Sequence, residues 1–525
     1  MQNHIISIKM WSNVERKITI PEFYQNKNVL ITGGTGFVGK LLVEKLLRSC
    51  SGINKIYVLI RPKHGKSPQD RMIDATNDIL FDTIRKENSE ALNKIVPISG
   101  DIEKVNLGLS EKDKSTIIEN VTIIFHSAAS VRFDDSIKKA TFINLRSARE
   151  ITLLARQLKK IDVFVNVSTA FSNCDRIIVE EKLYPAKMNW RDLIRLAEEC
   201  DEATLQHLMH KLIYPMPNTY VFTKSLAEHA VVDLAKDKIP AVIIRPTIVC
   251  STISDPVPGW LDNINGTSGV LYGVAKGVIR PMWTETNGEL NHVFADSVTK
   301  ALIIASWKTA LSGNTNDVCI YNLASDLNIR IEDMTKLGNS YIKTNPSEFY
   351  LWPPKAQSHN SYYVYYFFVL LKNLLPAIII DTLLILSRRQ PMLWKLNRKI
   401  FISMSFLVPF MSNIWSFKIE NYMELRKSIL QEDSKQFTIE HLGEKISSKK
   451  LYENLLIYYN GIRKYFAKEA PPTEAMIKKQ ARLVLVEKLW KTFLLGLVLY
   501  YVFCKNRLIS VLSSKIYTYF ENLDA

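Results

Sequence analysis

Tyr220 and Lys224 are the two residues whose types and spacing most directly suggest chemistry in this sequence. They stand four positions apart in the stretch PNTYVFTKSLAEH, so on a helix they would share one face. A phenol has a pKa of about 10 and is a poor acid at neutral pH. We therefore expect the ammonium of Lys224 and the nicotinamide charge of a bound cofactor to lower the pKa of Tyr220 by stabilising the phenolate. A solvated helix face can show the same spacing, so the pair needs partners before it indicates a site.

Hydroxyl and amide side chains upstream of this pair could complete a site for proton transfer. Ser168 and Thr169 follow the strand-like stretch VFVNV, where a hydroxyl could donate to a substrate carbonyl. Asn144, in FINLRSARE, could hold a water molecule that relays protons to Lys224. The ordered set predicts carbonyl reduction by hydride transfer. In this reading Ser168 or Thr169 polarises the carbonyl and Tyr220 supplies the proton, while Lys224 holds the cofactor ribose.

A glycine-rich turn in NVLITGGTGFVGKLLVEKLL indicates where such a cofactor would bind. An apolar strand precedes the turn, and apolar residues with helical spacing follow it. The free N–H groups of a helix N-terminus attract phosphate, and glycine lets a pyrophosphate approach the backbone. The spacing is G-x-x-G-x-x-G, a variant of the dinucleotide fingerprint that is typical of short-chain dehydrogenases. The alternative is a turn without a ligand. The predicted contacts from this loop are Gly33, Thr35, Gly36, Phe37 and Gly39.

The next strand predicts which nucleotide is bound. The stretch KIYVLIRP ends in Arg61, at the position where an acidic residue would contact the ribose 2′-OH of NAD. Arg61 and Lys63 offer cations to a 2′-phosphate, so the sequence favours NADPH, unless these residues are only solvated charges on a loop. After the following strand, Asp101 and Ile102 could contact the adenine.

The order of elements predicts an α/β fold with a doubly wound parallel Rossmann sheet. Strands and helices alternate up to about residue 330, and only three of the 19 glycines lie beyond residue 350, where we expect a mainly helical domain. The stretch NPSEFYLWPPKAQSHNS reads as the connection. The predicted parts are an N-terminal extension (1–25), the cofactor-binding and catalytic domain (26–345), a helical domain (346–470) and a membrane-associated segment (471–525).

The net charge and the cysteine content indicate which binding partners and which cellular compartment to expect. The net charge is +16, of which residues 351–525 carry +12, with 25 Lys and Arg against 13 Asp and Glu. No nucleic-acid-binding module is present, so this excess favours an anionic membrane surface or the phosphates of CoA over nucleic acid. The six cysteines show no metal-ligand spacing, so we expect no metal and a catalytic part in the reducing cytosol. Charged residues near the N-terminus argue against a signal peptide.

Two apolar stretches could attach the chain to a membrane. Thr492–Cys504 is uncharged over 13 residues, which is short of the roughly 20 that span a bilayer, so it could make a short span, lie in the interface or pack as a buried helix. Residues 364–386 are long enough but contain Lys372, Asn373 and Asp381. We expect the second stretch to touch or enter the membrane, with a core helix as the alternative. The endoplasmic reticulum is the first choice of membrane; a peroxisome or lipid droplet stays open, although the chain ends in NLDA rather than SKL.

Several longer stretches resemble the fatty acyl-CoA reductases, which are extended short-chain dehydrogenase/reductases. They are TGGTGFVGK, LIRPKHGKS, HSAASVRFD, VSTAFSNCDR, YVFTKSLAE, IIRPTIV and, most specifically, PVPGWLDNINGTSGVLYGVAKGVIR. The C-terminal stretches LLPAIIIDTLLILSRRQPMLWKLNRKIF and SNIWSF are similar to the smaller domain of these enzymes. The sequence departs from the usual pattern of the family at two places. Ser147 stands where a glycine is common, and the stretch NHVFADSV keeps Asp296 but differs from the usual residues just before it.

The resemblance implies a substrate class that the spacing of residues does not show. It implies NADPH-dependent reduction of a fatty acyl-CoA to a primary alcohol through an aldehyde, with no metal and with a homo-oligomer left open. Two alternatives stay open: a membrane-bound dehydrogenase acting on a sterol or another lipid alcohol, and a non-catalytic scaffold that binds lipid or nucleotide.

Overall fold

The computed structural model describes residues 17–63, 65–284, 289–324, 328–439 and 448–521. The chain forms two compact units, which interleave along the sequence. We call residues 1–263, 287–330 and 404–465 the sheet unit, and residues 264–286, 331–403 and 466–525 the helical unit. The predicted boundaries at residues 345 and 470 describe the order of domains along the chain and stay a prediction.

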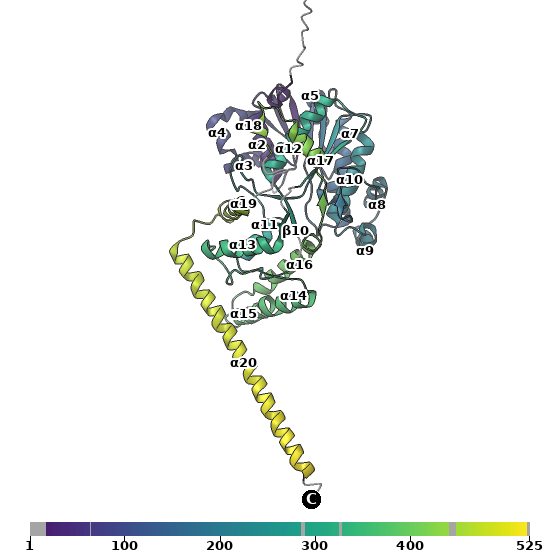
Figure 1. Cartoon of the computed structure of the whole chain (residues 1–525). Helices are drawn as coiled ribbons and strands as arrows, with labels where there is room; N and C mark the ends of the chain where they lie inside the picture. Colours follow the sequence, from purple (N-terminus) through teal and green to yellow (C-terminus); the bar gives the residue numbers. More distant parts are fainter. Residues whose placement is uncertain (1–16, 64, 285–288, 325–327, 440–447, 522–525) are drawn as a thin grey trace, which may run out of the picture. The chain divides into compact units, whose positions relative to one another are not determined.

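The sheet unit contains a parallel sheet of seven strands, so the predicted Rossmann class is confirmed (Figure 1). The sheet order is β11-β7-β5-β4-β1-β2-β3, and every pairing in it is parallel. The order reverses between β1 and β4, and ligands of such sheets bind outside the carboxyl ends of the strands at this point. The strands are β1 Asn28–Thr32, β2 Lys55–Ile60, β3 Ile95–Ser99, β4 Ile123–His126, β5 Val163–Val167, β7 Ala241–Pro246 and β11 Cys319–Leu323.

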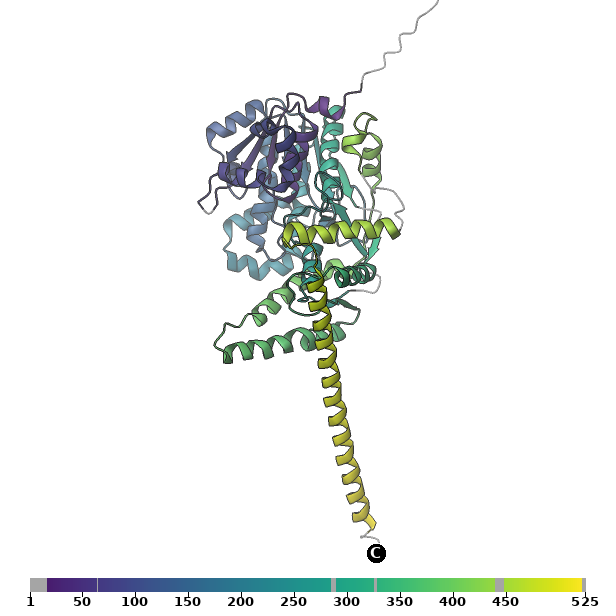
Figure 2. The same ribbon diagram turned by 90° about the vertical axis from the view of Figure 1, so that its left-hand side faces the viewer.

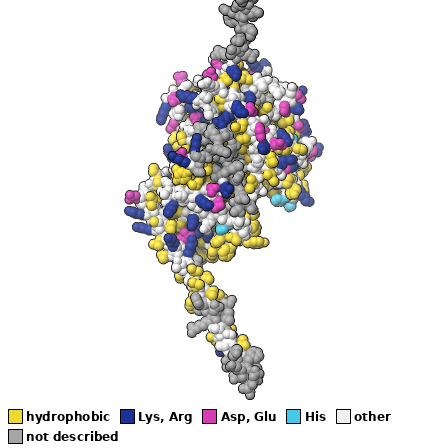
Figure 3. Space-filling view, viewed as in Figure 1, with side chains coloured by type: hydrophobic (Ala, Val, Ile, Leu, Met, Phe, Trp, Pro, Cys, Tyr) yellow, Lys and Arg dark blue, Asp and Glu magenta, His cyan; other side chains and the backbone are white. Residues whose placement is uncertain are grey.

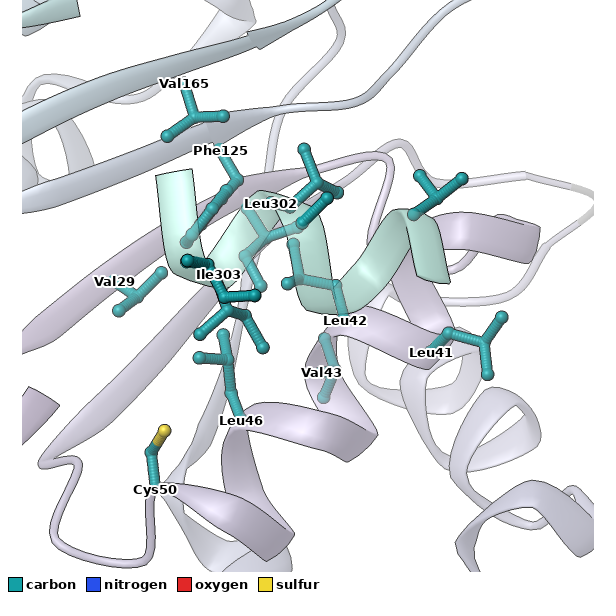
Figure 4. Packing of buried hydrophobic residues seen from close by; sticks show 14 of the residues in the cluster. Val29, Leu41, Leu42, Val43, Leu46, Cys50, Phe125, Val165, Leu302 and Ile303 are labelled. Atoms are coloured by element: carbon teal, nitrogen blue, oxygen red, sulfur yellow. The ribbon is translucent and has the colours of Figure 1, made fainter. Parts of the chain in front are cut away.

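Alternate residues of the central strands face two separate apolar cores, which is why these strands read as continuous apolar runs. One core joins Val29 and Ile31 to helices α2 (Phe37–Ser49) and α12 (Ala295–Ser312), and Figure 4 shows its side chains interlocking. The other core joins Leu30 to helices of the opposite face, α7 (Ser147–Ala155) and α10 (Thr219–Ala235).

Part of the predicted N-terminal extension belongs to the core of the sheet unit. Helix α1 (Ile20–Tyr24) begins with a capping box between Thr19 and Glu22. Ile20 and Tyr24 are fully buried, and the Tyr24 hydroxyl donates a hydrogen bond to the carbonyl oxygen of Ile303 over 3.3 Å. The first core therefore includes residues that precede the first strand of the sheet.

The remaining elements of the sheet unit connect and cover the layers. Its further helices and helical turns are α3 Pro68–Thr76, η1 Ile79–Phe81, α4 Asp82–Glu87, η2 Ser89–Lys94, η3 Val105–Gly108, α5 Glu111–Asn120, α6 Ile137–Ala140, η4 Thr141–Arg146, η5 Ala170–Asn173, α8 Trp190–Glu199, α9 Glu202–Ile213, α17 Glu420–Lys427, α18 Ser434–Phe437, α19 Ser448–Gly461 and η7 Ile462–Phe466. The short strands are β6 Ile178–Val179, β8 Ile248–Cys250, β10 Glu289–Phe294, β12 Asn328–Arg330 and β14 Ser416–Phe417.

The helical unit is mainly helical, as predicted for the C-terminal part. A helix of 25 residues, Tyr362–Leu386, consists of α14 (Tyr362–Val369), the π-helical turn η6 (Leu370–Leu374) and α15 (Leu375–Leu386). The long helix α20 contains the predicted apolar stretch Thr492–Cys504 and runs without a break (Figure 2). The other elements are α11 Thr267–Ala275, β9 Pro281–Trp283, α13 Ile331–Thr344, β13 Gln357–His359, the first part of α16 Leu393–Ser412, and α20 Glu474–Glu521.

In the described part of the chain, one helix is both long and apolar enough to cross a membrane, judged by length and composition: Tyr362–Leu386, which contains an 18-residue window with a mean hydropathy of 2.1. Membrane association through this stretch and through Thr492–Cys504 stays a prediction.

Candidate active site

The glycine loop between β1 and α2 is closed so tightly that side chains would not fit at two positions. Gly33 has a φ of +77°, and a Cβ there would lie 2.8 Å from the main-chain nitrogen of Ala128. A Cβ on Gly39 would lie 2.1 Å from the carbonyl oxygen of Gly33. Helix α2 therefore packs directly against the loop that precedes it.

The N-terminus of α2 is suited to hold an anion. Gly36 is the N-cap residue and supplies no capping side chain, so no side chain of the cap accepts from the N–H groups of the first turn. The ring of Phe37 stacks on Trp260 with a centroid distance of 5.5 Å. Because the ring is held there, a cofactor contact of Phe37 would use its main-chain N–H group. Thr35 is half-buried in the same loop. These residues fit the predicted pyrophosphate site.

Arg61 and Asp101 meet at the ends of β2 and β3. The Arg61 guanidinium donates to the Glu103 carboxylate over 2.7 Å and lies 3.9 Å from Asp101. Its side chain is 47% exposed, and Lys63 is exposed beside it. The Asp101 carboxylate accepts from the Glu103 main-chain N–H over 3.0 Å, and Ile102 is partly buried against the second core. The predicted nucleotide residues thus lie at one edge, although Arg61 already has an acidic partner.

Thr169, Tyr220 and Lys224 come together at the end of β5. The N-cap residue Asn218 accepts from the Val221 N–H over 3.0 Å and so starts α10 just before Tyr220. A hydrogen bond joins the side chains of Tyr220 and Thr169. The Lys224 ammonium donates to the carbonyl oxygen of Val167 over 2.7 Å. Two hydroxyls and an ammonium therefore converge where strand β5 ends.

Burial shifts the pKa values of Tyr220 and Lys224 in opposite directions. In the protein alone, burial raises the pKa of Tyr220 to about 12, and the hydrogen bond with Thr169 acts in the lowering direction. Burial lowers the pKa of Lys224 to about 8, partly opposed by the negative charge of Glu228. In the protein alone, desolvation of the phenolate therefore dominates the pKa of Tyr220. A lower pKa in the presence of Lys224 and the nicotinamide charge of a bound cofactor stays a prediction.

Ser168 faces away from Tyr220 and belongs to a buried charged network. Its hydroxyl donates to the Glu228 carboxylate over 2.6 Å, and Ser172 donates to the same carboxylate over 3.1 Å. Arg245 forms a bidentate pair with Glu228 over 2.8 and 2.7 Å, and both side chains are fully buried. The geometry thus favours Thr169 over Ser168 as the hydroxyl beside Tyr220.

Sequence reasoning missed Glu228 and Arg245. Glu228 follows Lys224 by four positions, which is the spacing that joined Tyr220 to Lys224, so the helix face could have been followed one turn further. The position of Arg245 on β7 gave no comparable signal, because its partner lies on another element.

Asn144 ties the loop after β4 to helix α10. Its amide oxygen accepts from the Ser130 N–H over 2.9 Å, and its amide nitrogen donates to the Ser130 carbonyl and to the Thr223 hydroxyl over 3.2 and 3.1 Å. It lies in the π-helical turn η4, and such turns are frequent at functional sites. The side chain is thereby committed to positioning the loop.

Ser147, which stands where a glycine is common in the family, belongs to a buried chain of hydrogen-bonding side chains with His126 and Thr32. The Nδ1 atom of His126 lies 2.7 Å from the Thr32 hydroxyl, and its Nε2 atom lies 3.4 Å from the Ser147 hydroxyl. Burial lowers the pKa of His126 to about 3, so the ring is neutral.

Asp296, in the stretch NHVFADSV, holds the loop after β8. Its carboxylate accepts hydrogen bonds from the N–H groups of Ile253, Ser254 and Asp255 over 3.0 to 3.1 Å.

Aromatic side chains form an apolar wall beside Tyr220. The ring of Phe133 lies 5.8 Å from the ring of Tyr220 and stacks on Phe410 at 5.2 Å. Phe171 meets Phe410 edge to face at 5.2 Å and Trp415 at 5.3 Å. Residues from 404 onward thus contribute to the surroundings of the site.

The fold and this group of residues define an oxidoreductase of the short-chain dehydrogenase/reductase type that uses a nicotinamide cofactor. Known structures agree on the fold. The terminal R domain from the myxalamid PKS-NRPS pathway aligns with a TM-score of 0.55 and 17% identity, covering 84% of this chain and 91% of that domain. The reductase domain of a nonribosomal peptide synthetase from Mycobacterium tuberculosis aligns with a TM-score of 0.51 and 15% sequence identity, and the alignment covers 84% of this chain and 92% of that domain.

Sequence comparison gives the family. Residues 31–302 and 372–469 each match a family described as male sterility protein, the first match being its NAD-binding part. The chain is 35% identical to fatty acyl-CoA reductase 1 of Rattus norvegicus over 458 residues, covering 86% of this chain and 87% of that protein. It is 36% identical to the putative fatty acyl-CoA reductase CG8306 of Drosophila melanogaster, covering 86% and 88%. The chain belongs to the fatty acyl-CoA reductase family.

Proposed function

We propose that this protein reduces long-chain fatty acyl-CoA to a primary fatty alcohol, using NADPH. The observation that carries the proposal is the convergence of Thr169, Tyr220 and Lys224 at the carboxyl end of β5, the same edge of the parallel sheet at which the glycine loop follows β1, in a chain that is similar over most of its length to proteins named fatty acyl-CoA reductase. The substrate class comes from those relatives, and the chemistry comes from the site.

The residues around the glycine loop fit a dinucleotide. Gly33 and Gly39 allow the loop to close tightly, and Gly36 leaves the N-terminus of α2 without a capping side chain, which suits a pyrophosphate there. Arg61 and Lys63 supply cations for a 2′-phosphate, which supports NADPH over NADH; Arg61 would exchange Glu103 for that phosphate. When bound, the cofactor supplies hydride to the carbonyl carbon of the substrate.

The site residues stabilise negative charge on the carbonyl oxygen in both halves of the reaction. Thr169 and Tyr220 donate hydrogen bonds to the thioester oxygen, and the phenol of Tyr220, protonated at neutral pH, gives up its proton as hydride reaches the carbon. The resulting hemithioacetal loses CoA as the thiol when its C–S bond breaks, which leaves an aldehyde. A second hydride and a second proton, again through Tyr220, give the alcohol, so two NADPH and two protons are consumed.

Lys224 and Asn144 support proton delivery. The Lys224 ammonium, which Val167 holds one turn from Tyr220, orients the cofactor ribose and favours the phenolate that forms during the reaction. The Asn144 side chain binds Ser130 and Thr223, so it supports the site by holding the loop after β4 against helix α10. Ser168 acts through Glu228 as a positioning residue.

We further propose that the protein is membrane-associated, with its active site in the cytosol and the endoplasmic reticulum as the first membrane to examine. The apolar helix Tyr362–Leu386 and the basic excess of residues 351–525 support this. Such attachment would place the enzyme where long acyl chains and fatty alcohols partition.

Product analysis tests the proposal. Detergent-solubilised protein is incubated with acyl-CoAs of several chain lengths, and with a sterol, in the presence of NADPH or NADH. We expect alcohol from acyl-CoA with NADPH, a loss of about 10²–10⁴-fold in Tyr220→Phe, and no loss in the matched variant Tyr214→Phe, whose ring is 80% exposed. Oxidation of the sterol, or NADPH binding without any product, would contradict the proposal.

A further inference from the structure

The helix Tyr362–Leu386 exposes an apolar stripe along its whole length. Large apolar side chains at every fourth position, starting at Tyr363, are between 39% and 83% exposed: Tyr363, Phe367, Leu371, Leu375, Ile379 and Leu383. Figure 3 shows hydrophobic side chains gathered on the face of the helical unit that Figure 1 labels α14 and α15. A surface helix of a water-soluble protein turns such a stripe toward the core.

The opposite stripe of the same helix faces inward and carries polar groups. It runs, also at every fourth position, through Tyr365, Val369, Asn373, Ala377 and Asp381, all of which are buried or half-buried. The Asn373 amide donates to the carbonyl oxygen of Val278 over 3.0 Å, so the protein covers the middle of the helix on this side. The helix thus exposes an apolar stripe and turns its polar residues Asn373 and Asp381 inward, which is the arrangement expected where the outer medium is lipid.

The helix and the first part of α16 form an antiparallel hairpin, residues 362–403. Asn373 donates to Asn397 over 3.3 Å, and the rings of Tyr366 and Phe401 lie 5.8 Å apart. At the turn, the Asp381 carboxylate accepts from the N–H groups of Met392, Leu393 and Trp394 over 2.8 to 3.1 Å. The start of α16 therefore exposes fewer unpaired N–H groups, which are costly in an apolar medium.

The hairpin is basic at its turn. Its one acidic residue is the buried Asp381, whereas five cations between positions 388 and 399 are exposed: Arg388, Arg389, Lys395, Arg398 and Lys399. Trp394, which is half-exposed, lies among them, and tryptophan is enriched at membrane interfaces. Apolar surface and cations together match an anionic lipid surface.

We infer that the hairpin 362–403 lies in the plane of an anionic membrane surface, with its outward apolar stripe in the lipid and its basic turn at the headgroups. This rests on the proposed membrane attachment and names the surface that makes it. A crossing orientation would require Arg388 and Arg389 to pass through the bilayer and would expose the inward polar stripe to lipid. A second copy packed on the same face would bring two sets of five cations together.

Cysteine labelling on preformed vesicles tests the orientation. The full chain, with Cys319 and Cys504 replaced by serine, is bound to vesicles of phosphatidylcholine and phosphatidylserine and treated with an impermeant maleimide. The unsubstituted background chain corrects for the remaining cysteines. We expect Ile379→Cys to react about tenfold more slowly than the matched surface variant Ile73→Cys, because lipid excludes the reagent. Arg389→Cys should react within about twofold of Ile73→Cys, and neutral vesicles should reduce the protection of Ile379→Cys.

Other outcomes would overturn the inference in distinguishable ways. Protection of Arg389→Cys that ends when the vesicles are permeabilised would show that the hairpin crosses the bilayer. Disulfide-linked dimers of Ile379→Cys would show that a second copy covers the stripe. Rapid labelling of Ile379→Cys in a chain that still floats with the vesicles would refute the hairpin while leaving membrane attachment intact, and failure to float would refute both.

Discussion

The core of the sheet unit and the hairpin 362–403 treat their large apolar side chains differently. Helix α12 turns Leu302 and Ile303 inward, fully buried against the sheet, as a helix in water does. The hairpin turns Asn373 and Asp381 inward and leaves Ile379 45% exposed. The difference teaches that the two units are built for different surroundings, water for one and, as we infer, a lipid surface for one face of the other.

The largest expected effect concerns the buried carboxylate of the sheet unit. Glu228→Gln leaves the fully buried Arg245 without a counter-charge, which typically costs about 3–5 kcal/mol of stability. Glu424→Gln is the matched control, because Glu424 pairs with Lys427 at the surface, where a pair contributes about 0–1 kcal/mol. Chemical denaturation measures both. Equal losses would mean that the buried pair gives the core no special stability.

The same substitution in the two regions sharpens the comparison further. Ile303→Ala removes a fully buried side chain and should cost about 2–5 kcal/mol through lost burial and the cavity left behind. Ile379→Ala should change the free energy of unfolding in detergent by less than about 0.5 kcal/mol, because its side chain is half-exposed. A large loss for Ile379→Ala would show that the outward stripe packs against protein.

A change of pH should act on the sheet unit through His126. Its pKa in the folded protein is lowered to about 3, so the unfolded chain binds more protons between the ordinary histidine pKa and that value. The stability that it contributes is complete above about pH 6.5 and is lost as the pH falls toward 3. We expect His126→Gln to reduce the decline in melting temperature over this range by a measurable fraction. If the melting temperature of His126→Gln declined with falling pH as steeply as that of the unsubstituted protein, other groups would be responsible for the decline.

The smallest expected effect concerns the buried carboxylate of the hairpin. Asp381→Ala removes the acceptor for three N–H groups at the start of α16, and loss of such a cap costs about 1 kcal/mol. Hydrogen exchange of Met392, Leu393 and Trp394 should accelerate about fivefold, with little effect on the global melting temperature. Thr382→Ala, at the neighbouring exposed position, is the control. Global unfolding by Asp381→Ala would contradict the local role given to this residue.

Much of the candidate site could be predicted because its spacing is local. The glycines between β1 and α2, and Tyr220 with Lys224, lie within single turns or on one helix face, where geometry follows directly from sequence separation. The pKa of Tyr220 could not be predicted in this way. It depends on how deeply the surrounding elements bury the phenol, and that depth is set by long-range packing.

By itself, the sequence indicated the family through the resemblance of its longer stretches. It also determined the parallel sheet from the order of its elements, and the glycine loop and the helix that carries Tyr220 and Lys224 from periodicity and spacing, which act within one element. Tertiary structure alone decided that Thr169 rather than its neighbour Ser168 meets Tyr220, since adjacent residues of an extended chain point to opposite sides. It also decided that Glu228 pairs with Arg245, that residues 404–465 pack with the sheet, and that the helix Tyr362–Leu386 turns its polar side inward. Each of these depends on which faces of distant elements meet, and no local pattern carries that information.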